Sequence, residues 1–210
     1  MTYMPASNPA SAWKSLKEGN QRFVAGAPLH PSQGIEDRTR LADGQSPRAI
    51  LFGCADSRVA AEIIFDQGLG DMFVVRTAGH TVDSSVLGSI EYGVAVLGAH
   101  LIVVLGHDKC GAVRATTDAL DSGDIPGGYI RDVVERVTPS VLSARRDGYT
   151  DVDDFMARHV EETGNLLMQR SRIIAEKVES GDAAIVGLTY KLSEGSARLR
   201  EVIGDIGEKP

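Results

Sequence analysis

The sequence predicts an α/β fold: a mostly parallel central β-sheet flanked by helices and preceded by an N-terminal helical arm. Short apolar runs typical of buried strands alternate with longer stretches in which apolar residues recur at helical spacing. Such alternation implies parallel strands joined by helices that cover both faces of the sheet. Because no repeat, low-complexity tract or linker interrupts residues 1–210, we expect one domain, with residues 1–47 forming the arm and a crossing segment.

The N-terminal arm is expected to open with a helix that Ser7 or Asn8 caps, with Pro9 in the first turn. Its apolar face comprises Trp13, Leu16, Phe23 and Val24. The polar stretch from residue 26 to residue 47 is long for a plain loop. We therefore expect it to carry a short helix or to lie across another surface.

Four strands are expected in the remainder of the chain, over residues 49–52, 72–76, 101–105 and 183–190. Helices are expected near residues 60–65, from Asp83 to about Leu97, directly after Cys110, and in two long stretches between about 129 and 180. Pro139 is expected to kink these helical stretches. A short segment over residues 197–203 follows the last strand.

Composition restricts the partners that this chain can have. A net charge of −7 without a basic stripe argues against nucleic acid, which selects for clustered Lys and Arg. No apolar run approaches the ~18 residues that a membrane helix needs, and the first residues lack the charged start and apolar block of a secretory signal. With only two cysteines, free thiols in a reducing compartment are expected. The sequence thus predicts a cytoplasmic protein that acts on a small molecule.

Both cysteines and one histidine directly follow buried strands. Cys54 comes after the run at 49–52, and His107 and Cys110 come after the run at 101–105. Ligands gather at the carboxyl edge of a parallel sheet. Two thiolates and an imidazole suit zinc, and three protein ligands leave a fourth position open for water or substrate. Buried structural thiols are the plain alternative; a redox dithiol fits less well, because the second cysteine lies in HxxC and not in CxxC. The pattern favours a catalytic zinc site.

Asp56 and Arg58 stand two and four residues after Cys54. Residues two apart in an extended segment point the same way, so both are expected to face the metal. The guanidinium can then hold the carboxylate with a two-pronged hydrogen bond. The alternative is a solvated turn with a surface ion pair that contributes little.

The segments CADSRV (54–59) and GHDKCGAV (106–113) together resemble the paired signature of the β-class carbonic anhydrases. The similarity covers most of the chain from Trp13 onward, through GQSP (44–47), FVVRTAG (73–79) and SIEYGV (89–94). The resemblance implies a β-carbonic anhydrase-like fold and one Zn²⁺ per subunit, held by Cys54, His107 and Cys110. It also places Asp56 and Arg58 beside the metal, with Asp56 as a conditional fourth ligand.

The implied activity is the reversible hydration of carbon dioxide to bicarbonate and a proton, which makes the protein a lyase. Zinc can lower the pKa of bound water from about 15.7 to about 7, and two thiolates are expected to leave that pKa somewhat higher. Zinc-bound hydroxide would attack carbon dioxide, with Asp56, held by Arg58, orienting it. As pH falls, the Asp56 carboxylate is expected to displace the zinc water, which would close the fourth position and stop catalysis.

Four residues are expected to bind substrate by the same resemblance. Gln45 matches a glutamine that donates a hydrogen bond to the substrate, although an ordinary loop glutamine explains it equally well. Phe73 and Tyr92 match positions on the apolar side of the pocket, which core packing alone would also explain. Gly111 can present its N–H to a bound anion, or simply begin a helix. Thr77 and Ala78 stand where some relatives carry valine, so the pocket wall is expected to be looser.

The other histidines are not expected to bind the metal. His80 lies near the strand edge, where a proton relay is the minority alternative to packing. His30, His100 and His159 are expected to have surface or packing roles.

Two other functions compete with carbon dioxide hydration. The first is hydrolysis of a sulfur analogue, carbonyl sulfide or carbon disulfide, on the same scaffold. The second is a structural zinc in a binding module, which the carboxylate–guanidinium pair argues against. The resemblance also implies a homodimer or homotetramer in which the N-terminal helix lies over a neighbour; its apolar face would equally suit packing on its own subunit.

Overall fold

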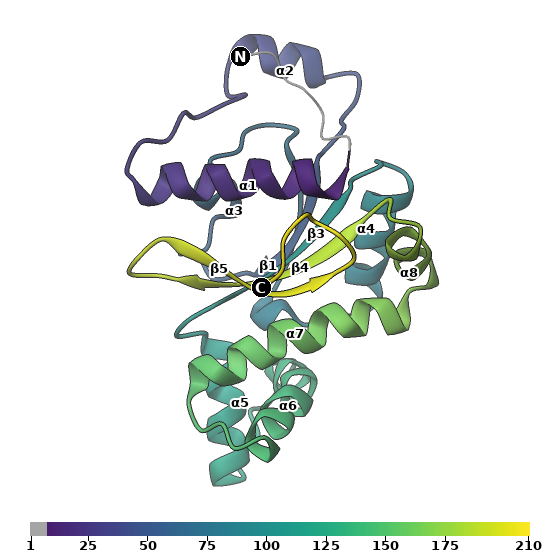
Figure 1. Cartoon of the computed structure of the whole chain (residues 1–210). Helices are drawn as coiled ribbons and strands as arrows, with labels where there is room; N and C mark the ends of the chain where they lie inside the picture. Colours follow the sequence, from purple (N-terminus) through teal and green to yellow (C-terminus); the bar gives the residue numbers. More distant parts are fainter. Residues whose placement is uncertain (1–7) are drawn as a thin grey trace.

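A five-stranded sheet forms the centre of the computed structural model, which describes residues 8–210 (Figure 1). Its strand order is β2-β1-β3-β4-β5. The strands are β1 (Ala49–Cys54), β2 (Met72–Thr77), β3 (Leu101–His107), β4 (Ala184–Lys191) and β5 (Ser196–Ile203). The first four run parallel, which confirms the predicted mostly parallel sheet. The segment left unassigned after the last predicted strand forms β5, antiparallel to β4.

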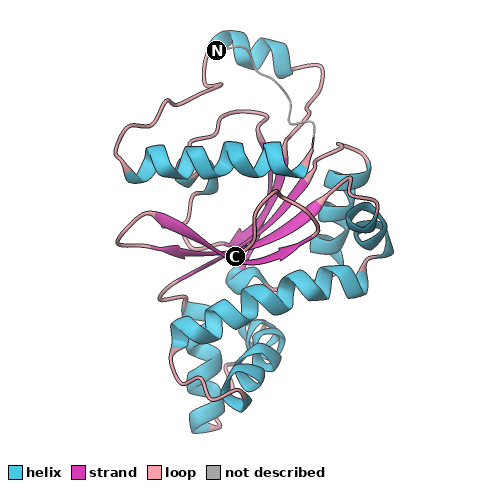
Figure 2. Cartoon of the chain, in the orientation of Figure 1, coloured by secondary structure: helices cyan, strands magenta, loops and turns pink. Residues whose placement is uncertain are grey.

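Helices cover both faces of the sheet, as Figure 2 shows in cyan against the magenta strands. One face carries α4 (Ser84–Ala95), α5 (Gly111–Ser122), α6 (Ile130–Arg146), α7 (Val152–Arg170) and α8 (Arg172–Glu179). Alternate strand residues point to opposite faces, so Ile50 and Phe52 join the core beneath these helices while Ala49 and Leu51 join the core on the other side. Two hydrophobic cores thus fix the sheet from both sides.

The opposite face is covered by α1 (Pro9–Val24) and the short α3 (Ala61–Ile64). Asn8 caps α1 through a hydrogen bond from the Ser11 N–H; Ser7 lies outside the described residues. Trp13 and Leu16 are buried against this chain's own sheet, whereas Val24 is half-exposed and does not belong to the buried face. The apolar face of α1 therefore packs within its own chain, as one of the two predicted alternatives has it.

The other expectations about helices are met with two differences. The polar stretch carries the predicted short helix, α2 (Ile35–Leu41), with no buried residue. The region predicted as two long helices contains three, because Ser171 ends α7 and caps α8 through the Ile174 N–H. Helix α6 continues through Pro139. No helix within residues 8–210 is long and apolar enough to span a membrane.

Candidate active site

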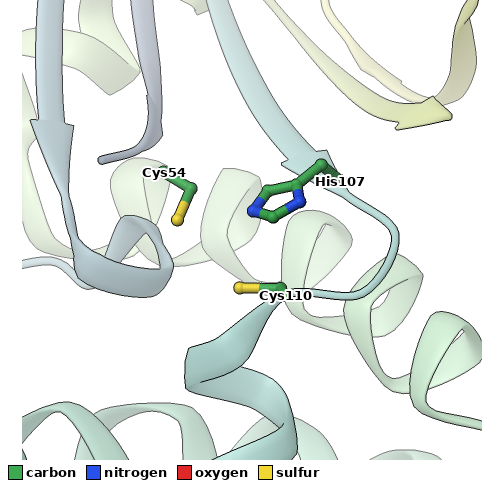
Figure 3. Close-up of side chains that lie close together, drawn as sticks. All are labelled: Cys54, His107 and Cys110. Atoms are coloured by element: carbon green, nitrogen blue, oxygen red, sulfur yellow. The ribbon is translucent and has the colours of Figure 1, made fainter. Parts of the chain in front are cut away.

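Three ligand side chains meet at the carboxyl edge of the sheet (Figure 3). Cys54 is the last residue of β1 and His107 the last residue of β3; Cys110 follows after a short turn. The two strands are hydrogen-bonded neighbours in which Gly53 pairs with Leu105, so both strands end at the same place. One sulfur, one nitrogen and one sulfur lie within 4.8 Å of one another, all three residues being buried. Strand register therefore brings Cys54 and His107 together, and the turn after β3 adds Cys110.

The imidazole of His107 is oriented to bind a metal. Its Nδ1 lies 2.8 Å from the carbonyl oxygen of Asp108. A carbonyl only accepts hydrogen bonds, so Nδ1 carries the proton and Nε2 presents a lone pair. Within the described part of the chain this Nε2 is buried without a hydrogen-bond partner. A buried imidazole nitrogen without a partner, between two free thiols, fits a bound zinc ion.

The two cysteines hold one proton between them when no metal is bound. A hydrogen bond from Cys110, with a smaller contribution from His107, lowers the pKa of Cys54 to about 4 against the opposing effect of burial. The Cys54 thiolate and burial raise the pKa of Cys110 far above its ordinary value. The pair is thus one thiolate and one thiol, which a divalent cation would convert to two thiolates.

Asp56 and Arg58 form the expected two-pronged pair. Arg58 donates from Nε and from a terminal nitrogen to the two oxygens of Asp56, at 2.9 and 2.7 Å. These hydrogen bonds hold the pKa of the Asp56 carboxyl well below its usual range. Oδ2 of Asp56 lies 3.9 Å from Nε2 of His107, beside the metal ligands.

The backbone around this pair differs from the expected extended segment. Val59 donates its N–H to the carbonyl of Asp56, and the Arg58 N–H donates to the Asp56 carboxylate. The segment is therefore a turn closed by its own side chain. Arg58 reaches Asp56 because the chain folds back, and not because alternate residues of a strand share a face.

Arg76 is a site residue that the sequence reasoning missed. From β2 its guanidinium donates to the carbonyl oxygens of Cys54 and Asp56, at 3.0 and 2.7 Å. It thereby fixes the loop that carries the first metal ligand and the carboxylate. The segment FVVRTAG could have indicated this role. It forms β2, which runs parallel to β1 and pairs Thr77 with Cys54, so the residues at its carboxyl end lie beside the metal ligands.

Three of the expected substrate-binding residues do not meet the metal ligands within one chain. Gln45 precedes β1 and lies beside Leu69 and Gly70, just before β2, at the opposite end of these strands from Cys54. Phe73 pairs with Ile50, about 13 Å before the end of β1. Tyr92 lies next to Phe73, with 6.2 Å between ring centroids. These side chains share the amino-terminal half of the sheet with one another, not with the zinc ligands.

Gly111, Thr77 and Ala78 do lie at the metal edge. Gly111 is the first residue of α5, directly after Cys110, and open space surrounds its Cα where a side chain would project. Thr77 ends β2, and its hydroxyl donates to the Thr81 carbonyl across the short helix η1 (Ala78–His80).

The remaining histidines fall into buried and surface groups. His80 is fully buried, and burial holds its pKa well below the ordinary value, which favours packing over proton transfer. His159 is also buried, between α6 and the sheet edge. His100 bonds the Asp182 carbonyl near the surface, and His30 is exposed.

Comparisons with known proteins agree with this geometry. A family model described as carbonic anhydrase matches residues 49–197. Carbonic anhydrase 2 of Mycobacterium tuberculosis is 66% identical over 206 residues, which cover 98% of this chain and 100% of the relative. The carbonic anhydrase of Mycolicibacterium smegmatis is 63% identical over 205 residues, with 98% and 100% covered.

Solved structures show the same fold. A tetrameric β-carbonic anhydrase of Sordaria macrospora superposes with a TM-score of 0.69 at 25% identity, covering 77% of this chain and 84% of the other. The β-carbonic anhydrase of Coccomyxa, in complex with acetazolamide, gives 0.70 at 23% identity, with 89% and 86% covered.

The fold and the site define an α/β metalloprotein whose Cys–His–Cys centre lies buried at the carboxyl edge of the parallel strands. Its ligand set, its carboxylate–guanidinium pair and the similarity over almost the whole chain agree. The chain belongs to the β-class carbonic anhydrase family, as the motifs predicted.

Proposed function

We propose that this chain catalyses the reversible hydration of carbon dioxide to bicarbonate and a proton. The observation that carries the proposal is the buried two-sulfur, one-nitrogen group beside an ionised carboxylate. Cys54, His107 and Cys110 would hold one zinc ion. When bound, zinc supplies a Lewis acid that activates water at an open fourth position.

Asp56 would act as a fixed hydrogen-bond acceptor at this position. Because Arg58 keeps its pKa low, the carboxylate stays ionised at neutral pH and can accept a hydrogen bond from the attacking water. Arg58 holds the carboxylate, and Arg76 holds the backbone beneath it. This arrangement orients the attacking water toward carbon dioxide.

We also propose that Asp56 can close the site by becoming a fourth metal ligand at low pH. Its Oδ2 atom lies 3.9 Å from Nε2 of His107, beside the group of side chains that would hold the metal. X-ray absorption spectra at low and high pH test this idea. A carboxylate ligand that appears only at low pH supports it; a zinc shell with no such ligand at any pH contradicts it.

The activity is tested by zinc analysis and stopped-flow carbon dioxide hydration on the purified protein. We expect one zinc per chain, hydration that stops when a chelator removes the metal, and recovery when zinc is added back. Full zinc occupancy without hydration would contradict the proposal. Parallel assays with carbonyl sulfide and carbon disulfide separate it from hydrolysis of a sulfur analogue, and a structural zinc would hydrate none of the three.

A homodimer or homotetramer is the assembly that best accounts for the separated substrate-binding residues. The half-exposed Tyr92 and the first residues of the partly buried edge strand β2 lie far from their own metal group but are open to a second copy. In such an assembly Gln45, Phe73 and Tyr92 would line the neighbour's site. The cytoplasmic location remains a prediction from the sequence.

A further inference from the structure

Two buried polar side chains, His159 and Ser140, fix the position of a turn that contacts the metal ligand Cys54. Gly79, in η1, donates its N–H to Sγ of Cys54 at 3.4 Å. Gly79 has φ +63°, and a Cβ atom there would lie 2.6 Å from Cβ of Ala112. The residue is therefore wedged between the end of β2 and the first turn of α5, where only glycine fits.

The carbonyl of the same Gly79 is bonded by His159 of α7. Nε2 of His159 lies 2.9 Å from that oxygen, and Nδ1 lies 2.9 Å from Oγ of Ser140 on α6. The carbonyl only accepts, so Nε2 must carry the proton, and Nδ1 must then accept from the Ser140 hydroxyl. Burial lowers the pKa of His159, which agrees with this neutral form.

The hydrogen bonds of His159 do more than give two buried polar side chains a partner. Two polar side chains in a helix interface could be replaced by apolar ones at little cost if they bonded only each other. Here both ring nitrogens are used, and one of them reaches across to the residue that contacts a metal ligand. Fixing the Gly79 carbonyl fixes the turn, and the turn aims the Gly79 N–H at the Cys54 sulfur.

We propose that His159, oriented by Ser140, is a positioning residue for the metal centre, which acts by holding the Gly79 N–H on the Cys54 sulfur. An N–H···S hydrogen bond withdraws negative charge from a thiolate, so it makes the bound metal a stronger Lewis acid. Partners of this kind, one step behind the ligands, typically change metal affinity by about 10- to 100-fold when they are lost. The inference rests on the proposed zinc site but not on the identity of the substrate.

The variants must remove the hydrogen bond without opening space. Ser140 and His159 line a groove of about 780 Å3 between α6 and α7, so truncation would admit water that replaces the lost donor. His159→Phe keeps the ring shape and removes the donor. His159→Gln keeps an N–H donor near the Nε2 position. Thr163→Val is the matched control, because this buried hydroxyl on α7 donates to the carbonyl of His159 within its own helix.

The test uses full-length protein loaded with zinc or with cobalt(II), whose thiolate charge-transfer band reports electron density on sulfur. For His159→Phe we expect about tenfold weaker zinc binding in competition with a chelator and a shift of the band to longer wavelength. His159→Gln should restore much of both, and Thr163→Val should change neither. Circular dichroism checks that each variant is folded.

Three outcomes decide the matter. An unchanged band and unchanged zinc affinity in folded His159→Phe would overturn the positioning role while leaving the proposed function intact. Equal effects in Thr163→Val would also overturn it, because packing of α7 would then be the cause. A parent protein that binds neither metal would overturn the zinc site, and the inference with it.

Discussion

At the scale of single residues, the chemistry of the site depends on charges that neighbours impose on each other. Cys54 is a thiolate chiefly because Cys110 donates to it, and Asp56 is a carboxylate because Arg58 does. Neither residue has these properties by itself. The roles of single side chains are therefore separable by substitutions that remove one donor at a time.

Loss of any metal ligand should abolish both zinc binding and activity. Three protein ligands leave no redundancy, so Cys54→Ser, His107→Ala and Cys110→Ser should each retain little zinc after dialysis. Metal analysis and stopped-flow hydration measure the two effects on the same samples. A variant with one zinc per chain and near-normal turnover would remove that residue from the ligand set.

Asp56→Asn should separate catalysis from metal binding. The amide cannot accept both Arg58 hydrogen bonds or a proton, so zinc should remain while hydration falls by at least about 100-fold. Arg58→Ala should act in the same direction by freeing Asp56 to swing. Arg131→Ala, which removes an exposed ion pair with Glu135 on α6, is the control and should be silent. Full activity in Asp56→Asn would show that the carboxylate has no catalytic role.

At the scale of elements, two carboxylates join outlying segments to the rest of the fold: Glu201 lies on the edge strand β5, and Asp66 binds the crossing segment. Glu201 of β5 lies opposite Gly187 of β4 and against Gly164 of α7, where Cβ atoms would crowd it. Asn165 donates to one of its oxygens, and the other is buried without a partner within the described residues. Burial raises the pKa of Glu201 to about 7.

This carboxyl should make stability depend on pH. A folded pKa near 7, against an ordinary value near 4.5, means that the folded chain binds more protons between these values, so the free energy of unfolding falls as pH rises from about 4.5 to about 7. Glu201→Gln should therefore stabilise the protein by about 1–2 kcal/mol at pH 8 and change little at pH 4.5. Urea unfolding at the two pH values measures this, with exposed Glu179→Gln as control. An equal effect at both pH values would contradict the assignment.

Asp66 attaches the crossing segment to the end of α3. Its carboxylate accepts from Arg22 at 2.6 Å and from the backbone N–H groups of Leu29 and His30 at 2.9 Å. Asp66→Ala would leave a partly buried guanidinium and two N–H groups unpaired, so the free energy of unfolding should fall by about 2–3 kcal/mol. Hydrogen exchange should increase first in residues 26–34. Unchanged exchange in that segment would show that other contacts hold it.

At the scale of the whole molecule, the metal ligands lie at the carboxyl end of the parallel strands, whereas three of the predicted substrate-binding residues lie near the amino-terminal end. Helix α1 covers its own sheet, with the Trp13 indole donating to Glu208 near the C-terminus. The outer edge of β2, in contrast, has no partner strand within the described chain. A second copy of the chain is the arrangement that can bring both halves of the expected pocket together.

Mixed oligomers test this arrangement. Gln45→Ala should impair hydration and Cys54→Ser should abolish it. In a mixed dimer the first subunit supplies an intact zinc site and the second an intact glutamine, so one complete site forms. Co-expression should therefore give about a quarter of the parent activity per site if subunits pair at random. Activity no greater than the average of the two separate variants would mean that each subunit uses its own residues.

How much the sequence could predict follows from how far each feature reaches along the chain. Apolar runs ending at Cys54 and at His107 predicted buried parallel strands, and strands of one sheet end at a common edge. The ligand set therefore followed from the chain order. The contact between Asp56 and Arg58 was also predicted, although a turn and not an extended segment produces it.

Only the tertiary structure decided the contacts that join distant segments. These include the Arg76 clamp on β1, the link from His159 to Gly79, the pairing of β5 with β4, the packing of α1 on its own sheet, and the distance between Gln45 and the metal ligands. Periodicity records which face of an element is apolar, but not which other element covers that face or in what register. Those choices depend on side-chain shape and hydrogen bonding summed over the folded core, which no local pattern contains.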